Sequence, residues 1–181
     1  YLLTDLARIE QWPGSEAARL LDGKLATKGV RNLAWFYITR QIIFTSNRKI
    51  VLQPSDFNGL RVRGLSPLAD AGLVAVGAIA KQMAAPEVYE ALQSGALDIG
   101  LTDVSAAVSR RFYEIQKFGT VASYNTAFFH LYINPRWFAG LRLEHRDAIE
   151  AAAKRAEKAA IGITEETAAA ALGALQANGM T

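Results

Sequence analysis

The sequence predicts an α/β fold whose sheet contains parallel strands. After Gly59, short apolar segments that suit strands alternate with segments that suit helices, and this alternation is typical of parallel sheets. The chain then continues into a run rich in Ala, Glu, Lys and Arg between Glu144 and Ala177. That run predicts a single helix roughly 50 Å long, which is long for a domain of this size.

The first elements are predicted from capping and strand-forming residues. Ser15 suits the N-cap of a short helix that continues through Leu21. The segment Trp35–Ile38 combines aromatic and β-branched side chains, so we expect a buried strand there. Residues Gln53–Gly59 carry Pro, Asn, Asp and Gly, which favour a turn that leads into the next strand.

A strand followed by a helix is predicted next. Leu60–Arg63 alternates apolar and cationic residues, as expected for a short strand with two different faces. Ser66 and Pro67 then open a helix that continues to about Val76, with Pro at its first position. The pair forms one strand–helix unit.

The same pattern repeats further along the chain. A helix is predicted between Pro86 and Gly95, because Pro suits a helix start and Gly its end. Leu97–Leu101 follows as a strand, and Thr102–Asp103 opens another helix. Ala127–Ile133 is the last predicted strand, and the Asn-Pro pair after it ends the extended segment.

The composition is that of a globular protein and excludes several classes. Of the 181 residues, 51% are hydrophobic and 20% are charged, so extended disorder is not expected. The 20 basic residues exceed the 17 acidic ones only slightly and are scattered, which argues against a nucleic-acid partner. The chain has no Cys, which excludes disulfides and thiolate chemistry. No apolar stretch approaches the ~20 residues of a membrane span.

The beginning of the sequence is unusual. Tyr1–Asp5 has neither an initiator Met nor the basic and apolar regions of a signal peptide. We expect this chain to be part of a longer protein.

Catalytic motifs are largely missing from the sequence. Ser46–Lys49 matches the pattern S-x-x-K, but its companion motifs are missing and the match carries almost no weight. We expect His130 and His145 to have hydrogen-bonded structural roles, because neither has a second metal ligand at a usable spacing. The carboxylates of the final helix are expected to form a solvated face. The sequence thus predicts no catalytic residue, metal or cofactor.

Two arginines in apolar surroundings suggest binding chemistry. Arg40 follows the strand at Trp35–Ile38, and Arg63 ends the strand that precedes Gly64. Strand ends of α/β folds face the crevice in which ligands bind. A guanidinium there can hold a carboxylate or a phosphate with paired hydrogen bonds. A surface position or an internal salt bridge is the alternative role for such an arginine.

Four ordered segments resemble the signature of solute-binding proteins of tripartite ATP-independent periplasmic (TRAP) transporters. These segments cover about 100 residues and are Thr45–Arg48 with Ser55–Arg63, Glu87–Asp98, Phe112–Phe118, and Leu131–Asn134 with Trp137. The resemblance implies a periplasmic-binding-protein-like fold of two α/β lobes that close on an organic acid in a cleft. It also implies a long helix that spans the lobes, and a chain that lacks the N-terminal part of a typical member.

The resemblance divides the chain into four segments. Residues 1–39 would belong to the first lobe and residues 40–125 to the second. Residues 126–165 would return to the first lobe, and residues 166–181 would continue the long helix into the second.

The resemblance also implies ligand-binding positions. Arg63 falls on the principal carboxylate-binding arginine of the family, and Arg40 lies near a second arginine that some members use. Thr102 matches a position at which some members place an Asn that helps to hold the carboxylate. The other positions implied to lie at the cleft or on the approach to it are Ser66, Ala85, Tyr124 and Asn125. Ala85 replaces a bulky aromatic residue of some members, which implies a differently shaped pocket.

The leading hypothesis is therefore a periplasmic protein, not an enzyme, that delivers an organic carboxylate to a TRAP membrane permease. The carboxylate could be a dicarboxylate, a keto acid or a sugar acid. Two alternatives remain open at this stage: an α/β enzyme acting on an anionic substrate, and the sensory ligand-binding domain of a signalling protein.

Overall fold

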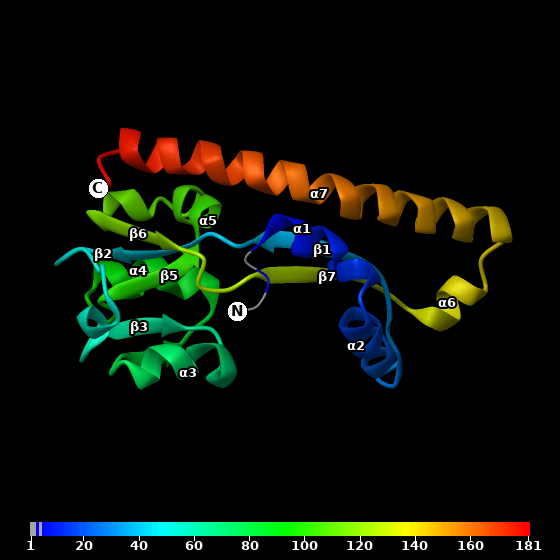
Figure 1. Ribbon diagram of the computed structural model, residues 1–181, viewed down its shortest axis with the longest axis horizontal. Coiled ribbons are helices and arrows are strands. Elements are labelled where there is room, and N and C mark those ends of the chain that lie inside the picture. The colour runs from blue at the N-terminus through cyan, green and yellow to red at the C-terminus, as the bar shows by residue number, and fades with distance from the viewer. Residues whose placement is uncertain (1–2, 4) are drawn as a thin grey trace. The chain divides into compact units, whose positions relative to one another are not determined.

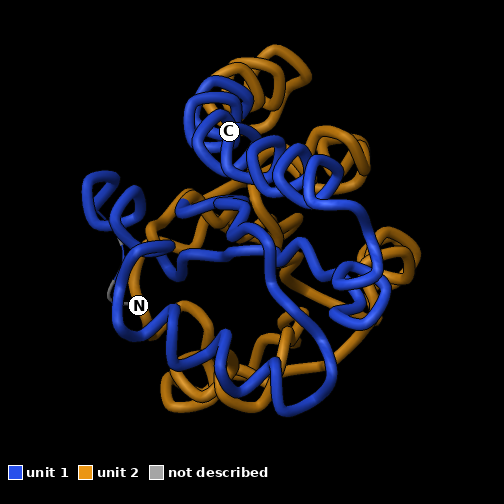
Figure 2. Tube along the Cα trace, turned by 90° about the vertical axis from the view of Figure 1, so that its right-hand side faces the viewer, with its two compact units in different colours: residues 1–40, 124–167 blue, residues 41–123, 168–181 orange. Residues whose placement is uncertain are grey.

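The computed structural model describes residue 3 and residues 5–181. The chain divides into two compact units (Figure 2). Unit 1 comprises Tyr1–Arg40 and Tyr124–Thr167, and unit 2 comprises Gln41–Ser123 and Ala168–Thr181. The chain therefore changes unit after residues 40, 123 and 167.

Unit 1 is built around two antiparallel strands, β1 (Arg31–Thr39) and β7 (Ala127–Ile133) (Figure 1). The register places Trp35 opposite His130, and their rings lie 4.0 Å apart between centroids. Aromatic pairs across strands add side-chain contacts to the hydrogen-bonded ladder of such a small sheet. The remaining elements of unit 1 are α1 (Leu6–Gln11), η1 (Trp12–Gly14), α2 (Glu16–Ala26), α6 (Pro135–Ala139) and the first part of α7.

Helix α7 (Leu143–Ala177) has 35 residues and is the longest element of the chain. Its residues up to Thr167 belong to unit 1, and those from Ala168 belong to unit 2. In unit 1 its buried face includes Ala153 and Glu157. In unit 2 it contributes Ala168, Ala171 and Leu175 to the core. The small Ala side chains allow the helix backbone to approach its neighbours closely.

Unit 2 contains a five-stranded mixed sheet with the strand order β4–β3–β5–β2–β6. Strand β3 runs parallel to both β4 and β5, whereas β2 runs antiparallel to both β5 and β6. The strands are β2 (Ile42–Ser46), β3 (Arg61–Gly64), β4 (Ile79–Gln82), β5 (Ile99–Asp103) and β6 (Phe118–Ala122). Strands β2 and β5 lie between two neighbours each, and most of their residues are buried.

Short helices connect these strands and cover the sheet. They are η2 (Pro54–Phe57), α3 (Pro67–Ala75), η3 (Ala85–Glu87), α4 (Val88–Gln93), α5 (Val104–Ser109) and η4 (Phe112–Glu114). The core of unit 2 joins Ile43 of β2, Leu92 of α4, Val104 of α5 and Phe112 of η4 with Leu175 of α7. This core therefore gathers side chains from both segments of the unit.

The structure confirms the predicted helix caps. Ser15 accepts a hydrogen bond from the amide of Ala18, and Ser66 accepts one from Ala69. Asp103 caps α5 through the amide of Ala106. These contacts satisfy amides that lack a partner within the helix.

Several elements differ from the predicted ones or were not predicted. The first buried strand is longer than expected and extends over Arg31–Thr39. The elements that the sequence analysis did not predict are α1, η1, β2, β4, η4, β6 and α6. Because β2 and β6 pair antiparallel with their neighbours, the sheet is mixed rather than wholly parallel.

The expectation that the carboxylates of the final helix are solvated is wrong for two of them. Glu157 is 9% exposed and accepts a hydrogen bond from the amide of Trp35. Glu165 also accepts hydrogen bonds from Tyr37 of β1 and from Arg40, the residue after that strand. Donors from the backbone and side chains of β1 thus bind these two carboxylates. The sequence pattern of a helix does not reveal such contacts, so it predicted that the carboxylates face solvent.

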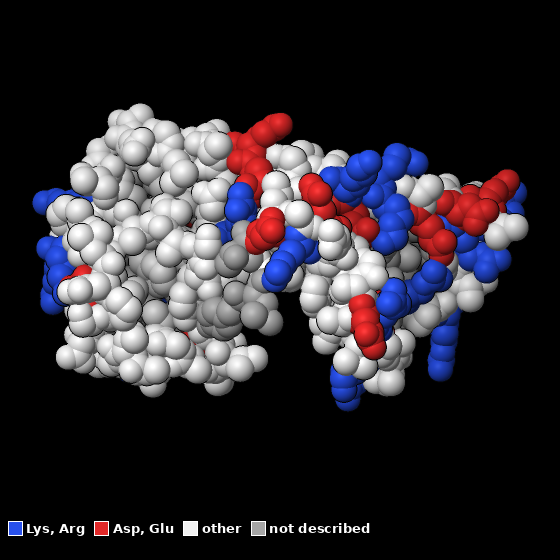
Figure 3. All heavy atoms as spheres, in the orientation of Figure 1, with Lys and Arg blue, Asp and Glu red and all other residues white. Residues whose placement is uncertain are grey.

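In the part of the chain that the structure describes, no helix is both long and apolar enough to cross a membrane. The face in Figure 3 shows basic and acidic side chains interspersed along the unit 1 portion of α7. On that face, unit 2 presents mostly uncharged side chains.

Candidate functional site

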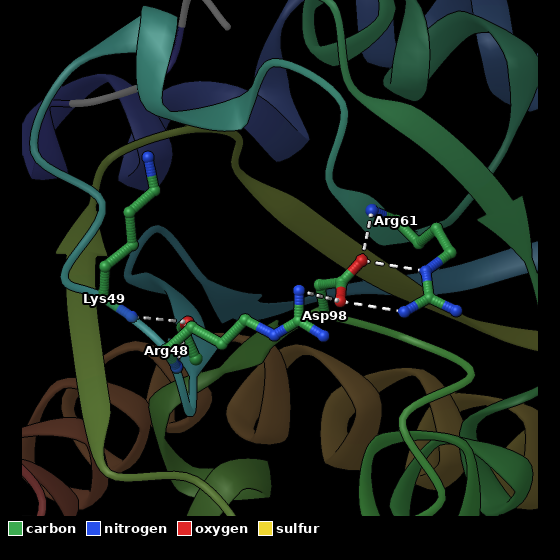
Figure 4. A network of polar contacts seen from close by, with 5 residues as sticks. Arg48, Lys49, Arg61 and Asp98 are labelled. Atoms are coloured by element: carbon green, nitrogen blue, oxygen red, sulfur yellow. Dashed lines mark hydrogen bonds and ion pairs between the residues drawn. The ribbon is translucent and has the colours of Figure 1, made fainter.

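Two arginines on one face of β3 have different partners. Arg61 and Arg63 alternate with Val62, which is fully buried. Figure 4 shows that Asp98 accepts hydrogen bonds from the backbone amide, Nε and Nη2 of Arg61 at 2.8–2.9 Å. Arg48, whose side chain is 73% exposed, adds an ion pair at 3.7 Å. The Arg61 guanidinium therefore holds the pKa of the Asp98 carboxyl below its usual range, and this ion pair is structural.

Arg63 is half-buried and has no carboxylate partner among the described residues. Its Nη1 donates to the backbone carbonyl of Leu101 at 2.9 Å, while its buried Nε has no hydrogen-bond acceptor. Burial, together with the charge of Arg110, lowers the pKa of the Arg63 guanidinium, and Asp103 partly offsets this effect. The group stays protonated at neutral pH. A desolvated cation that lacks a counter-ion is a place where an anion is stabilised.

Thr102 and Arg110 extend this cluster. Thr102 is 5% exposed, and its Oγ1 accepts a hydrogen bond from Nη1 of Arg110 at 3.0 Å. The nearby carboxylate of Asp103 already accepts hydrogen bonds from Ser105 and Ala106, at 2.6 and 2.8 Å. The carboxylate of Asp103 is thus engaged by the cap of α5 and forms no ion pair with Arg63 or Arg110 among the described residues.

In unit 1, Arg40 binds an internal carboxylate. Its Nε and Nη2 donate to Glu165 at 3.2 and 2.8 Å, and the hydroxyl of Tyr37 donates to the same carboxylate at 2.6 Å. The Arg40 guanidinium is the main cause of a lowered pKa at Glu165. Burial, and then the hydrogen bond to Glu165, raises the pKa of Tyr37 well above its ordinary value.

The other predicted positions are distributed between the two units. Ser66 is the N-cap of α3 and Ala85 begins η3, so both belong to unit 2. Tyr124 and Asn125 precede β7 in unit 1. The Oδ1 atom of Asn125 is buried and has no hydrogen-bond partner among the described residues.

Sequence reasoning did not identify three residues of these clusters, namely Tyr37, Arg110 and Glu165. Arg110 follows α5 in a turn and reaches back to Thr102. Its position eight residues after Thr102, which lies near the end of β5, is the local signal that could have indicated this contact. The link between Arg40 and Glu165 has no local signal, because 125 residues separate them.

In the described part of the chain, no group of three or more His, Cys, Asp or Glu residues is placed to bind a metal ion. His130 packs against Trp35, and its buried Nδ1 has no hydrogen-bond partner among the described residues, contrary to the expected hydrogen bond. His145 lies 3.1 Å from Nη2 of Arg142.

The chain belongs to the family DctP, bacterial extracellular solute-binding protein family 7, whose model matches residues 1–181. The family consists of extracytoplasmic binding proteins and not of enzymes, in agreement with the sequence analysis.

Individual relatives support this assignment. The chain is 31% identical over 182 residues to the C4-dicarboxylate-binding periplasmic protein DctP of Rhodobacter capsulatus, and covers 100% of its own length and 54% of that protein. It is 28% identical to the 2,3-diketo-L-gulonate-binding periplasmic protein YiaO of Escherichia coli, over 86% of this chain and 48% of the relative. The chain thus spans about half the length of these curated relatives.

Solved structures share the fold. DctP7 of Bordetella pertussis, an extracytoplasmic solute receptor that binds pyroglutamic acid, matches with a TM-score of 0.90 at 24% identity, over 100% of this chain and 59% of that one. A TRAP periplasmic solute-binding protein of Rhodoferax ferrireducens with bound malonate matches with a TM-score of 0.88 at 25% identity, over 98% and 56%. These matches confirm the predicted α/β class and the long C-terminal helix.

Proposed function

We propose that this chain is part of the extracytoplasmic solute-binding subunit of a TRAP transporter, and that it captures an organic carboxylate for a membrane permease. The observation that carries the proposal is Arg63. It is a half-buried guanidinium at the end of a strand, with no carboxylate partner among the described residues and with a buried Nε that lacks an acceptor.

The chemistry of Arg63 favours a carboxylate ligand. A guanidinium offers parallel N–H groups whose spacing matches the two oxygens of a carboxylate. Arg61, two residues earlier, binds Asp98 through Nε and Nη2 in this manner. A ligand carboxylate on Arg63 would supply the missing acceptor and counter-ion at once. Thr102 is proposed to donate a further hydrogen bond.

The ligands of relatives support an organic acid but differ among themselves. One relative binds C4-dicarboxylates, another binds 2,3-diketo-L-gulonate, and solved structures hold malonate or D-glucuronate. These ligands share a carboxylate or a related acidic group on a small polar body. We therefore propose a dicarboxylate, a keto acid or a sugar acid as the ligand of this protein.

The remaining sequence-predicted positions are kept as proposed ligand positions, each to be tested by itself. They are Arg40, Ser66, Ala85, Tyr124 and Asn125. Arg40 already binds Glu165, and the Ser66 hydroxyl already caps α3. We further propose that the segments 1–39, 40–125, 126–165 and 166–181 belong alternately to the first and second lobes.

Titration calorimetry on the full-length protein tests the proposed function. The ligands are malonate, succinate, pyroglutamate and glucuronate, with the neutral diamide malonamide as a control. We expect at least one acid to bind with a Kd near 1 μM, which corresponds to about −8 kcal/mol, and malonamide not to bind. Absence of binding by every acid, or conversion of a bound acid to a product, would contradict the proposal.

A further inference from the structure

Arg110 lies where α5 ends, and its side chain returns to the strand that precedes this helix. Its Nη1 donates to Thr102 Oγ1 at 3.0 Å, and it forms no ion pair within the described residues. The adjacent Arg111 differs, because it is 66% exposed and forms an ion pair with Glu114. The two neighbouring arginines carry the same charge but have different surroundings.

The contact with Arg110 determines which hydrogen bonds the Thr102 hydroxyl can still form. A hydroxyl has one proton to donate and two lone pairs that accept. One lone pair of Thr102 accepts from a cation, and the hydroxyl makes no other hydrogen bond to the described residues. Its proton is therefore left for an acceptor that the described residues do not supply. Because the oxygen accepts from a cation, its O–H group is polarised and becomes a better donor.

The positive charges of Arg63 and Arg110 also favour a bound anion. Arg110 lies close enough to Arg63 to disfavour its protonated form. Asp103, whose carboxylate acts on Arg63, is occupied by the cap of α5. Two like charges with little compensation are unfavourable in partly buried surroundings, and a bound anion relieves this repulsion.

We propose that Arg110 is a positioning residue of the anion site, which orients the Thr102 hydroxyl toward a carboxylate bound by Arg63. This inference rests on the proposed function. It assigns to Arg110 an effect on carboxylate affinity that the exposed Arg111 does not have. Arg110 acts through Thr102 and does not itself need to touch the ligand.

The experiment is a titration of the full-length protein with malonate at low ionic strength, followed by the NMR signals of the arginine Nε–H groups. In the wild type we expect a saturable shift of the Arg63 signal. Arg110→Gln should weaken malonate binding roughly tenfold, the effect of one hydrogen bond that involves a charged group. Arg111→Gln removes the same charge and should change the Kd less than about twofold.

A double-mutant cycle separates positioning from general charge. Thr102→Val removes the hydroxyl at nearly constant shape and should also weaken binding roughly tenfold, whereas Thr102→Ser should bind like the wild type. If Arg110 acts through Thr102, the double variant Arg110→Gln/Thr102→Val should be little weaker than either single variant. Independent effects would multiply to about 100-fold.

The possible outcomes distinguish a failure of the proposed function from a failure of the role proposed for Arg110. If the wild type shows no saturable shift with malonate or with any other acid of the calorimetry panel, the proposed function fails, and this inference fails with it. If malonate binds but Arg110→Gln matches Arg111→Gln, or the cycle is multiplicative, only the role of Arg110 is overturned. A lower melting temperature of Arg110→Gln with unchanged affinity likewise assigns Arg110 a purely structural role and overturns the inference.

Discussion

Arg61 and Arg63 lie two residues apart on one face of β3, yet only Arg61 is bound by a carboxylate of the described residues. The difference follows from their partners along β5. Arg61 lies beside the start of β5 and binds Asp98, the residue that precedes this strand. Arg63 instead donates to the carbonyl of Leu101, near the end of β5. A single strand thus carries one arginine that is bound by a carboxylate and one that has no carboxylate partner among the described residues. Variants of these side chains should separate stability from binding.

The first prediction concerns Asp98, whose side chain is 7% exposed and accepts three hydrogen bonds from Arg61. Asp98→Asn should reduce the stability of unit 2 at pH 7 by about 2–3 kcal/mol, because hydrogen bonds to a charged group are lost. Arg48→Gln, at the exposed end of the network, should cost less than about 1 kcal/mol. Hydrogen exchange of β3 and β5 amides measures both effects.

The pH dependence of this effect has a defined sign. The pKa of Asp98 is lowered in the folded state, so its contribution to stability is present above the unfolded pKa of about 4 and is lost as the pH falls through the folded value. The difference between wild type and Asp98→Asn should therefore shrink on acidification. An equal difference at pH 7 and pH 3 would show that packing, and not charge, is responsible.

The second prediction concerns Glu165, the shared acceptor of Arg40 and Tyr37. Glu165→Gln should destabilise unit 1 by about 2 kcal/mol at pH 7, because Arg40 and Tyr37 then lose their charged acceptor. The folded pKa of Glu165 is lowered, so this loss should decrease as the pH falls below about 4. Tryptophan fluorescence reports on the effect, since Trp12, Trp35 and Trp137 all belong to unit 1.

The adjacent Glu166 on α7 provides a matched control, because it is exposed. Glu166→Gln should leave the stability nearly unchanged. Ultraviolet titration adds a second test: removal of the Glu165 charge should lower the pKa at which Tyr37 ionises. If the Tyr37 titration is unchanged in Glu165→Gln, the described hydrogen bond does not persist in solution.

Local patterns predicted much of unit 2, because its caps and turns are short-range features. Ser66 and Asp103 were identified as helix starts from their residue types and from the apolar segments around them. Arg63 was singled out from its position at a strand end. Such features depend on neighbouring residues, and the sequence contains all the information needed to recognise them.

Long-range pairing accounts for what could not be predicted. Strand β2 lies between β5 and β6, and only this tertiary arrangement shows that Ile42–Ser46 is central in the sheet. Glu157 and Glu165 look like ordinary solvated residues of a helix until β1 is placed against them. Arg110 becomes part of the cluster only because the turn after α5 directs it back to Thr102.

The third prediction tests the packing between β5 and its neighbours at Gly100. A Cβ atom there would lie 2.6 Å from Thr45 Oγ1 and 2.9 Å from Leu92 Cδ1, closer than normal contact. Gly100→Ala should therefore destabilise unit 2 by about 1–3 kcal/mol. Gly173 on α7 has open space at its Cβ position, so Gly173→Ala should stabilise the helix by about 0.5–1 kcal/mol. Urea unfolding followed by circular dichroism compares the two; equal effects would contradict the close packing at Gly100.

The last prediction compares Arg63→Lys with Arg63→Ala in the full-length protein. Truncating one partner of a desolvated charge pair typically costs ~2–5 kcal/mol, or roughly 30-fold to several thousand-fold in affinity. Arg63→Ala should show a loss in this range for whichever acid binds. Arg63→Lys keeps the charge but loses the planar fork, so its affinity should fall between those of the wild type and Arg63→Ala.

Stability measurements distinguish a ligand-binding Arg63 from a structural one. The one hydrogen bond that Arg63 makes to the described residues is to the Leu101 carbonyl, and its burial without a counter-ion is unfavourable. Neither variant should therefore lower the melting temperature of the unliganded protein by more than a few degrees, the change that about 1 kcal/mol produces.

Arg61→Ala provides the contrast, because it leaves Asp98 without its main partner and should lower the melting temperature with little selective loss of affinity. Calorimetry with melting curves on all three variants measures both quantities. Unchanged affinity in Arg63→Ala, together with a lowered melting temperature, would refute the assignment of Arg63 as the carboxylate-binding residue.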